Sequence, residues 1–189
     1  MIEVLKSHII NRLGKDIENL DLVLSQFKLI QARRNEQLLQ QGEVCKYVYF
    51  VAKGCLQVYV YDSDYNETTR DIVLEDHWCS ELQSFGSGNP AAENIRAVEP
   101  SELYAINRQA FQTMMETIPQ FDKVYRQILE ASYANSVYRI NTFVALTALD
   151  RIKWLKQYRP NLMSRLSSKL IASYLGINKD VYSRLKSKL

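Results

Sequence analysis

The sequence predicts an α+β protein with three successive parts: a small β-domain preceded by short helices, one long helix, and a pair of short helices at the end. Across Lys28–Ile106, short β-branched and aromatic runs alternate with turn residues, which is typical of a β-sandwich or barrel. Across Phe111–Leu149 there is no glycine, and apolar residues recur three and four positions apart, as in a long helix. Across Leu166–Leu189, two short helical patterns flank Gly176.

The segment before the β-domain has helical spacing in two stretches, Ile2–Leu13 and Asp16–Phe27, with Gly14 between them. The clearest strands are Tyr47–Ala52 and Leu56–Tyr61, which meet at a turn around Gly54. The remaining segments that we expect are strands at Thr68–Leu74 and Glu102–Ile106, turns at 41–43 and 62–66, and a loop at Gln83–Glu93.

The apolar stripe of the long helix is wider than one small β-domain can cover. Its members, at three- and four-residue spacing, are Phe121, Val124, Tyr125, Ile128, Leu129, Tyr133, Val137, Ile140 and Val144. Such a stripe favours pairing with a second copy of the same helix. Packing against the chain's own β-domain is the alternative. We therefore expect a homodimer joined through Phe111–Leu149.

The end of the chain has the pattern of a helix-turn-helix. A short helix at Lys169–Leu175 is followed by Gly176, which can adopt the positive φ of a sharp turn, and Asn178 can cap the next helix. In that second helix, Lys179–Leu189, the apolar residues lie on one face, and polar and charged residues lie on the opposite, N-terminal side. This is the arrangement of a recognition helix that meets DNA bases. Two amphipathic helices in an ordinary small bundle are the alternative.

Charge separates this end from the rest of the chain. Residues 150–189 contain ten Lys or Arg and two acidic residues, for a net charge of +8. Because the whole chain carries +3, residues 1–149 carry −5. A basic segment on an acidic body favours binding to phosphates, which releases counterions.

Composition provides little for enzyme chemistry. Cys45, Cys55 and Cys79 lack the spacing of a redox or zinc motif, and His8 and His77 are the only histidines. We find no Gly-rich phosphate loop, nucleophile elbow or zinc-protease motif. We therefore expect no catalytic residues, no metal and no cofactor. The sequence also shows neither a signal peptide nor a run of about 18 apolar residues, so we expect a cytoplasmic location.

The order of these parts resembles the family of the bacterial cyclic-AMP receptor protein and the fumarate and nitrate reduction regulator, the Crp/Fnr transcription factors. The resemblance is carried by the stretch Leu38–Asp62 with Gly42 and Gly54, by the stretch Ser80–Ile106, and by the terminal helix pair. It implies a cyclic-nucleotide-binding-like β-roll, a dimerisation helix and a DNA-binding helix-turn-helix. It also implies RNA polymerase as a further partner.

The resemblance places the family's effector cassette, the segment that binds the cyclic phosphate, within Ser80–Ile106. In this sequence the cassette departs from the family pattern. In the cyclic-nucleotide binders of this family, a Gly-Glu pair opens the cassette, and an arginine followed by a small residue holds the cyclic phosphate. The corresponding residues here are Ser80-Glu81 and Ala91-Ala92, followed by Glu93. A buried phosphodiester without a paired cation is unfavourable by several kcal/mol, so we expect no response to cyclic AMP. Arg96 is the nearby arginine that could replace the missing cation if the loop shifted. The carboxylate of Glu81 could accept from a ribose hydroxyl, but a lone glutamate at a turn is more often solvated or bonded to the backbone.

Two other sensing routes of the family find little support. The iron-sulfur branch needs a cysteine cluster near the N-terminus, which is absent from this sequence. Haem sensing needs a suitably placed histidine, and His77 is the candidate, with an ordinary surface or core histidine as the alternative. The effector, if there is one, stays unidentified.

The resemblance places the base contacts on Lys179, Asp180 and Arg184. Arg184 can donate two hydrogen bonds to guanine, Asp180 can accept from cytosine, and Lys179 can reach guanine or phosphate. Ser167, at the cap of the first helix, suits a phosphate, although capping alone would also explain it. Ser183 and Lys186 are further DNA-backbone contacts, whereas Lys188 fits a solvated face.

These features define a dimeric DNA reader with three domains, at residues 1–110, 111–149 and 150–189. Family members continue into a β-hairpin wing, whereas this sequence stops at Leu189, so we expect either a wingless branch or a shortened chain. Two alternatives remain. One is a ligand- or partner-binding β-roll whose helix-turn-helix no longer reads DNA. The other is a cupin-like metalloenzyme, which two isolated histidines argue against.

Overall fold

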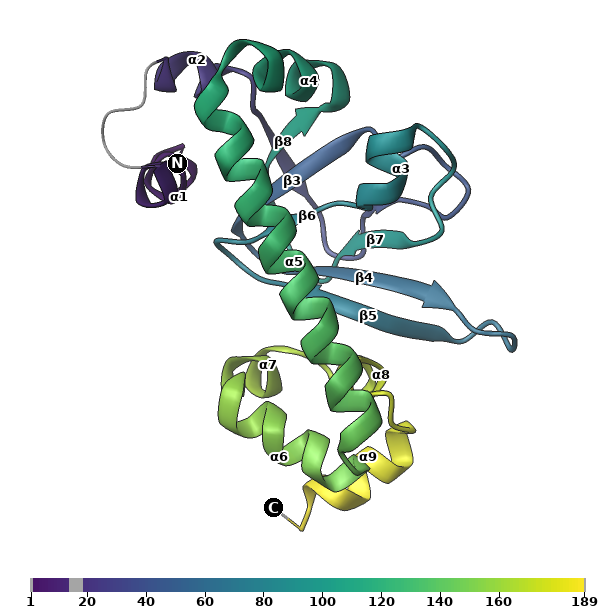
Figure 1. Ribbon diagram of the computed structural model, residues 1–189. Helices are drawn as coiled ribbons and strands as arrows, with labels where there is room; N and C mark the ends of the chain where they lie inside the picture. The colour runs from purple at the N-terminus through teal and green to yellow at the C-terminus, as the bar shows by residue number, and fades with distance from the viewer. Residues whose placement is uncertain (1, 14–18, 189) are drawn as a thin grey trace. The chain divides into compact units, whose positions relative to one another are not determined.

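The computed structural model describes residues 2–13 and 19–188. The chain forms two compact units. The first unit contains Met1–Val60 and Ile72–Glu130, and the second contains Tyr61–Asp71 and Ala131–Leu189. The expected α+β fold class is confirmed, with two antiparallel sheets in the β-roll and helices at the end of the chain (Figure 1).

The β-roll is built from two four-stranded sheets. In one sheet the order is β1 (Lys28–Ala32), β8 (Ser101–Asn107), β3 (Tyr47–Lys53) and β6 (Trp78–Cys79). In the other it is β2 (Gln37–Leu39), β7 (Asn94–Ala97), β4 (Leu56–Tyr61) and β5 (Glu67–Val73). The four strands expected from the sequence are therefore confirmed with shifts of one residue at some ends. The strands β1, β2, β6 and β7 were not expected, because they are short or polar.

The turn between β3 and β4 requires a glycine at position 54. Gly54 has φ +105°, and a Cβ at this position would collide with the side chain and backbone of Ser101. Its amide donates to Glu75 Oε1 at 2.9 Å. Only glycine fits both the positive φ and the close approach.

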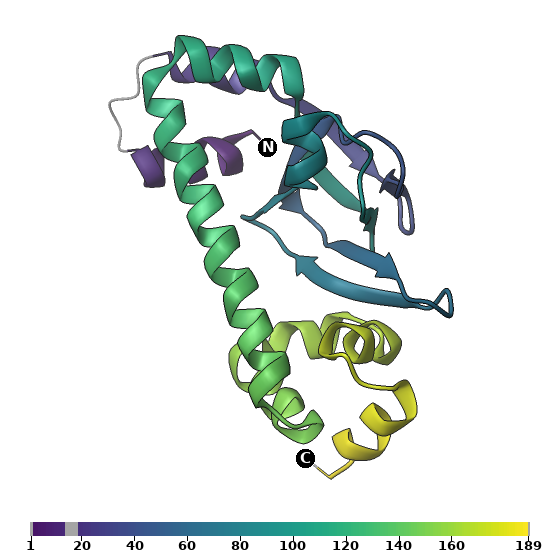
Figure 2. The ribbon, with the colours of Figure 1, turned by 45° about the vertical axis from the view of Figure 1, so that its right-hand side comes forward.

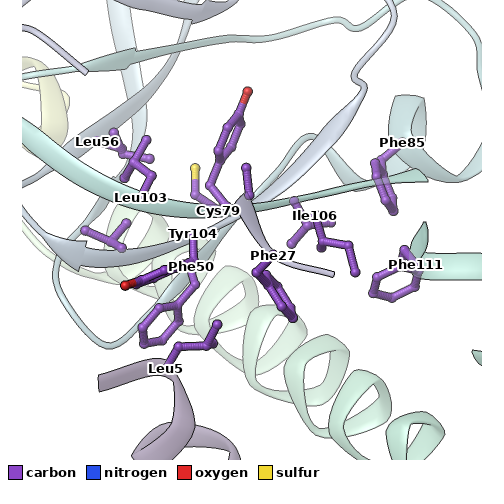
Figure 3. Close-up of a cluster of buried hydrophobic side chains, with 14 of the residues drawn as sticks. Leu5, Phe27, Phe50, Leu56, Cys79, Phe85, Leu103, Tyr104, Ile106 and Phe111 are labelled. Carbon is purple, nitrogen blue, oxygen red and sulfur yellow. The ribbon is translucent and has the colours of Figure 1, made fainter. Parts of the chain in front are cut away.

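The core of the roll is apolar and rich in aromatic residues (Figure 3). Phe50, Leu103 and Ile106 are fully buried in it. Phe111 packs edge to face against Phe85, with ring centroids 5.5 Å apart. This contact packs the helix that follows the roll against the helical segment Leu82–Ser87.

Two short helices precede the roll. The first, α1 (Glu3–Leu13), matches the expected segment and buries Leu5 and Ile9. The second, α2 (Leu20–Ser25), ends before Phe27, and the expected beginning at Asp16 lies outside the described residues.

The prediction of a single helix over Phe111–Leu149 was wrong. Three helices cover this region: α4 (Arg108–Thr117), α5 (Pro119–Ala145) and α6 (Ala148–Tyr158). Ile118 is extended, with φ −127° and ψ 92°, because a residue before proline is disfavoured in the helical conformation. The second interruption precedes Thr147, whose side chain caps α6 by accepting from the Asp150 amide.

The second unit contains the end of α5, the helices α6, α7 (Pro160–Arg165), α8 (Ser168–Leu175) and α9 (Lys179–Lys186), and residues 61–71, which include the β4–β5 turn and most of β5. Figure 2 shows its light-green and yellow helices beside the C-terminal end of α5. Its core includes Ile152, Leu155 and Leu175, all fully buried. The start of β5 is bonded to α8 through Ser173 Oγ, which lies 2.9 Å from both the Thr69 amide nitrogen and the Glu67 carbonyl oxygen.

Candidate nucleic-acid interface and effector cassette

The turn between α8 and α9 has helix-turn-helix geometry. Gly176 has φ +61°, its amide donates to Ser173, and the Ile177 amide donates to the Ala172 carbonyl at 2.9 Å. This is the bonding pattern of a glycine-terminated helix. A Cβ at position 176 would overlap the ring of Phe143, so the glycine is required by φ and by packing.

The second helix begins where the sequence predicts. The Asn178 side chain caps α9 by accepting from the Asp180 amide at 2.8 Å. Tyr182 is fully buried and Leu185 is half-buried, whereas Leu189 lies outside the described residues. One face of α9 therefore packs into the second unit.

The opposite face of α9 is free for a partner. Lys179, Asp180, Ser183 and Arg184 are exposed. Among the hydrogen bonds and ion pairs of the described residues, none engages the side chain of Lys179 or Arg184. Lys186 is also exposed, and its Nζ lies 5.9 Å from the centroid of the Tyr182 ring.

A polar side chain, that of Ser167, also lies at the start of α8. Ser167 is exposed and caps α8, with its Oγ accepting from the Leu170 amide at 3.2 Å. Because this bond uses the hydroxyl as an acceptor, its proton stays available for a phosphate. Lys169 is exposed in the same turn. Lys169 belongs to the basic segment but was not predicted as a DNA contact, although its place directly after a helix cap could have identified it.

In the cassette, Glu81 has a structural role. The expected loop at Gln83–Glu93 contains a short helix, α3 (Leu82–Ser87), and the nearly buried Glu81 is its N-cap. Its Oε2 accepts from the Ser84 amide at 2.7 Å. The carboxylate is thus bonded to the backbone, which was the alternative to a role in ligand binding.

The position expected for a phosphate-binding cation is apolar and packed. Ala91 is buried in the core of the roll. Its amide donates to the Glu43 carbonyl, and its carbonyl accepts from the Gly42 amide, both at 2.8 Å. Ala92 is exposed and Glu93 is half-buried.

Arg96 lies on the other face of the sheet. Its neighbours in β7, Ile95 and Ala97, belong to the core, and alternation along a strand turns Arg96 away from them. Its Nε donates to Gln57 Oε1 at 2.9 Å, and its guanidinium carbon lies 4.7 Å from the centroid of the Tyr59 ring. The structure therefore does not bring Arg96 to Glu81 and Ala91.

His77 is exposed, and its Nδ1 lies 2.8 Å from the Glu75 carbonyl oxygen. Within residues 2–13 and 19–188, no three His, Cys, Asp or Glu side chains gather as a metal site. Among the same residues, no helix has both the length and the apolar character needed to cross a membrane.

Comparison with known proteins agrees with this geometry. Residues 29–118 match the family model of the cyclic nucleotide-binding domain. The β-roll is therefore similar to a cyclic nucleotide-binding domain. No curated protein sequence matches the chain.

Solved structures extend the likeness beyond this domain. The regulator CLP of Xanthomonas campestris, described as responsive to c-di-GMP, is 17% identical with a TM-score of 0.74, and the match covers 90% of this chain and 89% of CLP. FixK2 of Bradyrhizobium japonicum is 18% identical with a TM-score of 0.72, and the match covers 86% of this chain and 84% of FixK2. A CooA mutant of Carboxydothermus hydrogenoformans is 18% identical with a TM-score of 0.69, and the match covers 96% of this chain and 82% of CooA. The resemblance to Crp/Fnr regulators is thus confirmed at the level of the fold.

Proposed function

We propose that this protein is a homodimeric, DNA-binding transcriptional regulator of the Crp/Fnr type that does not respond to cyclic AMP. The observation that carries the proposal is the exposed face of α9 behind a correctly capped turn, with Lys179, Asp180 and Arg184 in solvent. Residues 1–110, 111–149 and 150–189 then serve as effector-type, dimerisation and DNA-binding segments. The protein acts in the cytoplasm, with RNA polymerase as a further partner.

Dimerisation is supported by the second half of α5. Tyr133, Val137, Ile140 and Val144 are exposed there, at successive spacings of four, three and four residues. This spacing is the a/d pattern of a two-stranded coiled coil. Exposed fractions of 73% for Tyr133, 61% for Ile140 and 82% for Val144 leave a contiguous apolar seam, which a second copy of α5 would cover.

DNA recognition follows from the side chains on α9. Arg184 would donate to the O6 and N7 atoms of guanine, and Asp180 would accept from the N4 amine of cytosine. Lys179 would bind guanine or phosphate, and Ser167, Ser183 and Lys186 would contact the DNA backbone. Two α9 helices of a dimer would enter successive major grooves about 34 Å apart on a two-fold symmetric site.

The lack of response to cyclic AMP follows from the cassette. Ala91 offers no charge to a cyclic phosphate, and Arg96 lies on the opposite face of the sheet. Glu81 uses its carboxylate to cap α3. Calorimetry should therefore detect no micromolar binding of cyclic AMP, and a micromolar dissociation constant would refute this part of the proposal.

The experiment that tests the whole proposal is selection of binding sites from a random DNA pool with the full chain. We expect a two-fold symmetric motif, bound less tightly as salt rises. Arg184→Ala should abolish the enrichment, whereas Lys188→Ala, a change at the solvated end of the same segment, should retain it. If no motif is enriched and binding is independent of salt, the alternative of a ligand- or partner-binding β-roll takes its place.

A further inference from the structure

Arg139 is a buried arginine in the second half of α5. Its exposed fraction is 8%. Its Nη2 donates to the carbonyl oxygen of Tyr174 at 2.6 Å. Its guanidinium carbon lies 3.9 Å from the centroid of the Tyr174 ring and 4.6 Å from that of Phe143. The side chain is therefore held between two aromatic rings and bonded to the end of α8.

The remaining donors of this guanidinium are not satisfied. Across residues 2–13 and 19–188, no atom accepts a hydrogen bond from Nε or Nη1 of Arg139. Burial lowers the pKa of Arg139; Tyr174 and Asp71 oppose this change, and Arg159 and Arg151 add to it. A buried charge with unsatisfied donors is unfavourable for folding. Stability alone does not explain an arginine at this position.

The bond that Arg139 does make has a specific location. Tyr174 lies in the last turn of α8, and Gly176 and α9 follow directly. A second arginine, Arg151 of α6, donates to the Leu175 carbonyl at 3.0 Å and to the Phe143 carbonyl at 3.1 Å. The two cations thus bind the free carbonyls at the ends of α8 and α5, where the helix dipoles favour positive charge.

We propose that Arg139 is a positioning residue, which fixes the direction of the helix-turn-helix relative to the dimer helix and so sets the half-site spacing that the dimer reads. The proposal rests on the proposed function. The bond at Tyr174 joins α5, which would carry the dimer seam, directly to the helix that precedes α9. In a dimer, a change in the direction of α8 relative to α5 would alter the distance between the two α9 helices, and half-site spacing follows from that distance.

The test replaces Arg139 with methionine. Methionine fills a similar space between the two rings without a charge, and neutral replacements of buried ionic groups are often as stable as the original. Arg139→Met should therefore leave the urea midpoint of unfolding unchanged or raise it. Arg139→Lys keeps one donor for the Tyr174 carbonyl and should retain most of the spacing preference.

DNA binding provides the readout that a purely structural role would not change. On the site selected by the wild type, we expect a preference of about tenfold or more over sites whose spacer is one base pair longer or shorter. In Arg139→Met this preference should fall to about threefold or less, with base preferences within each half-site unchanged. Arg126→Met is the matched control, because Arg126 lies on the same helix and pairs with Asp122 on the surface.

The outcomes separate the two proposals. If the wild type enriches no motif, the proposed function fails, and this inference fails with it. If the wild type selects a symmetric site and Arg139→Met keeps its spacing preference, only the positioning role of Arg139 is refuted. A lower unfolding midpoint in Arg139→Met also refutes it, because the arginine would then serve stability.

Discussion

The two halves of α5 have the same apolar spacing and opposite surroundings. In the first half, Phe121 and Val124 are buried, with exposed fractions of 3% and 0%, and the Phe121 ring lies 5.4 Å from that of Phe111. In the second half, Ile140 and Val144 continue the pattern in solvent. Helical periodicity thus identifies an apolar face, but it does not identify what covers the face.

The buried residues of the two halves differ in kind as well. The first half buries aromatic and aliphatic side chains, whereas the second buries Arg139 and Thr142, both polar. Because burial of charge is unfavourable unless it is compensated, the second half is poorly suited to stabilise a monomer. The difference is consistent with the proposals that this half serves association and the orientation of the helix-turn-helix.

The largest effect is expected from a cavity in the first half. Phe121→Ala should lower the free energy of unfolding by about 3–5 kcal/mol, because it removes a buried ring from the core. Urea unfolding followed by circular dichroism measures it. Leu22→Ala, at a residue that is 52% exposed, is the control, and a loss below about 1 kcal/mol for Phe121→Ala would contradict the burial of this half.

A charge in the second half should act on association instead. Ile140→Glu would place two carboxylates in the seam of the proposed dimer and weaken association by about 2 kcal/mol or more. Sedimentation equilibrium should show a monomer at concentrations where the wild type is a dimer. Leu22→Glu makes the same change on an exposed residue of α2 and should not alter the mass. An unchanged mass in Ile140→Glu would mean that the exposed stripe is not the interface.

A methyl group at Gly176 tests the packing at the end of the second half. Gly176→Ala should cost about 1–2 kcal/mol from the positive φ, and the added Cβ would also displace the ring of Phe143. Gly86→Ala is the matched control, since Gly86 lies in α3 with open space at its Cβ position. Equal unfolding midpoints for the two variants would contradict both the cost of the positive φ and the tight contact with Phe143.

The smallest effect is expected from pH, and it should be confined to the first unit. His8 Nδ1 donates to Asp76 at 2.6 Å, and its Nε2 accepts from Arg12 and Trp78. Burial lowers the pKa of His8 below its ordinary value of 6.5. Because the unfolded chain takes up a proton first, stability is complete above pH 6.5 and falls as the pH drops towards the lower pKa of the folded state.

Two histidine variants isolate this contribution. The residues of the second unit, 61–71 and 131–189, contain no histidine. Unfolding of His8→Gln should therefore vary less between pH 7.5 and pH 5 than that of the wild type, whereas exposed His77→Gln should behave as the wild type does. Equal pH dependence in His8→Gln and the wild type would argue against the buried, neutral histidine.

The sequence by itself determined the features that depend on a few neighbouring residues. The cap at Ser167, the turn at Gly176 and the cap at Asn178 were predicted and are present. The interruption at Ile118 was missed, although Pro119 supplied the local signal. The missing cation of the cassette was also visible in the sequence, because charge is a property of each residue.

Tertiary structure decided which way side chains face and what they bind. Arg96 faces away from the core because β7 pairs with β4 in one particular register, opposite Gln57, and a shift by one residue would reverse its direction. Glu81 caps a short helix in a segment that was predicted to be a loop. Arg139 came to lie between Tyr174 and Phe143 only because residues 35 positions apart meet. Local patterns specify turns and helices through contacts within about one helical turn, whereas burial and facing depend on long-range pairing that no local pattern encodes.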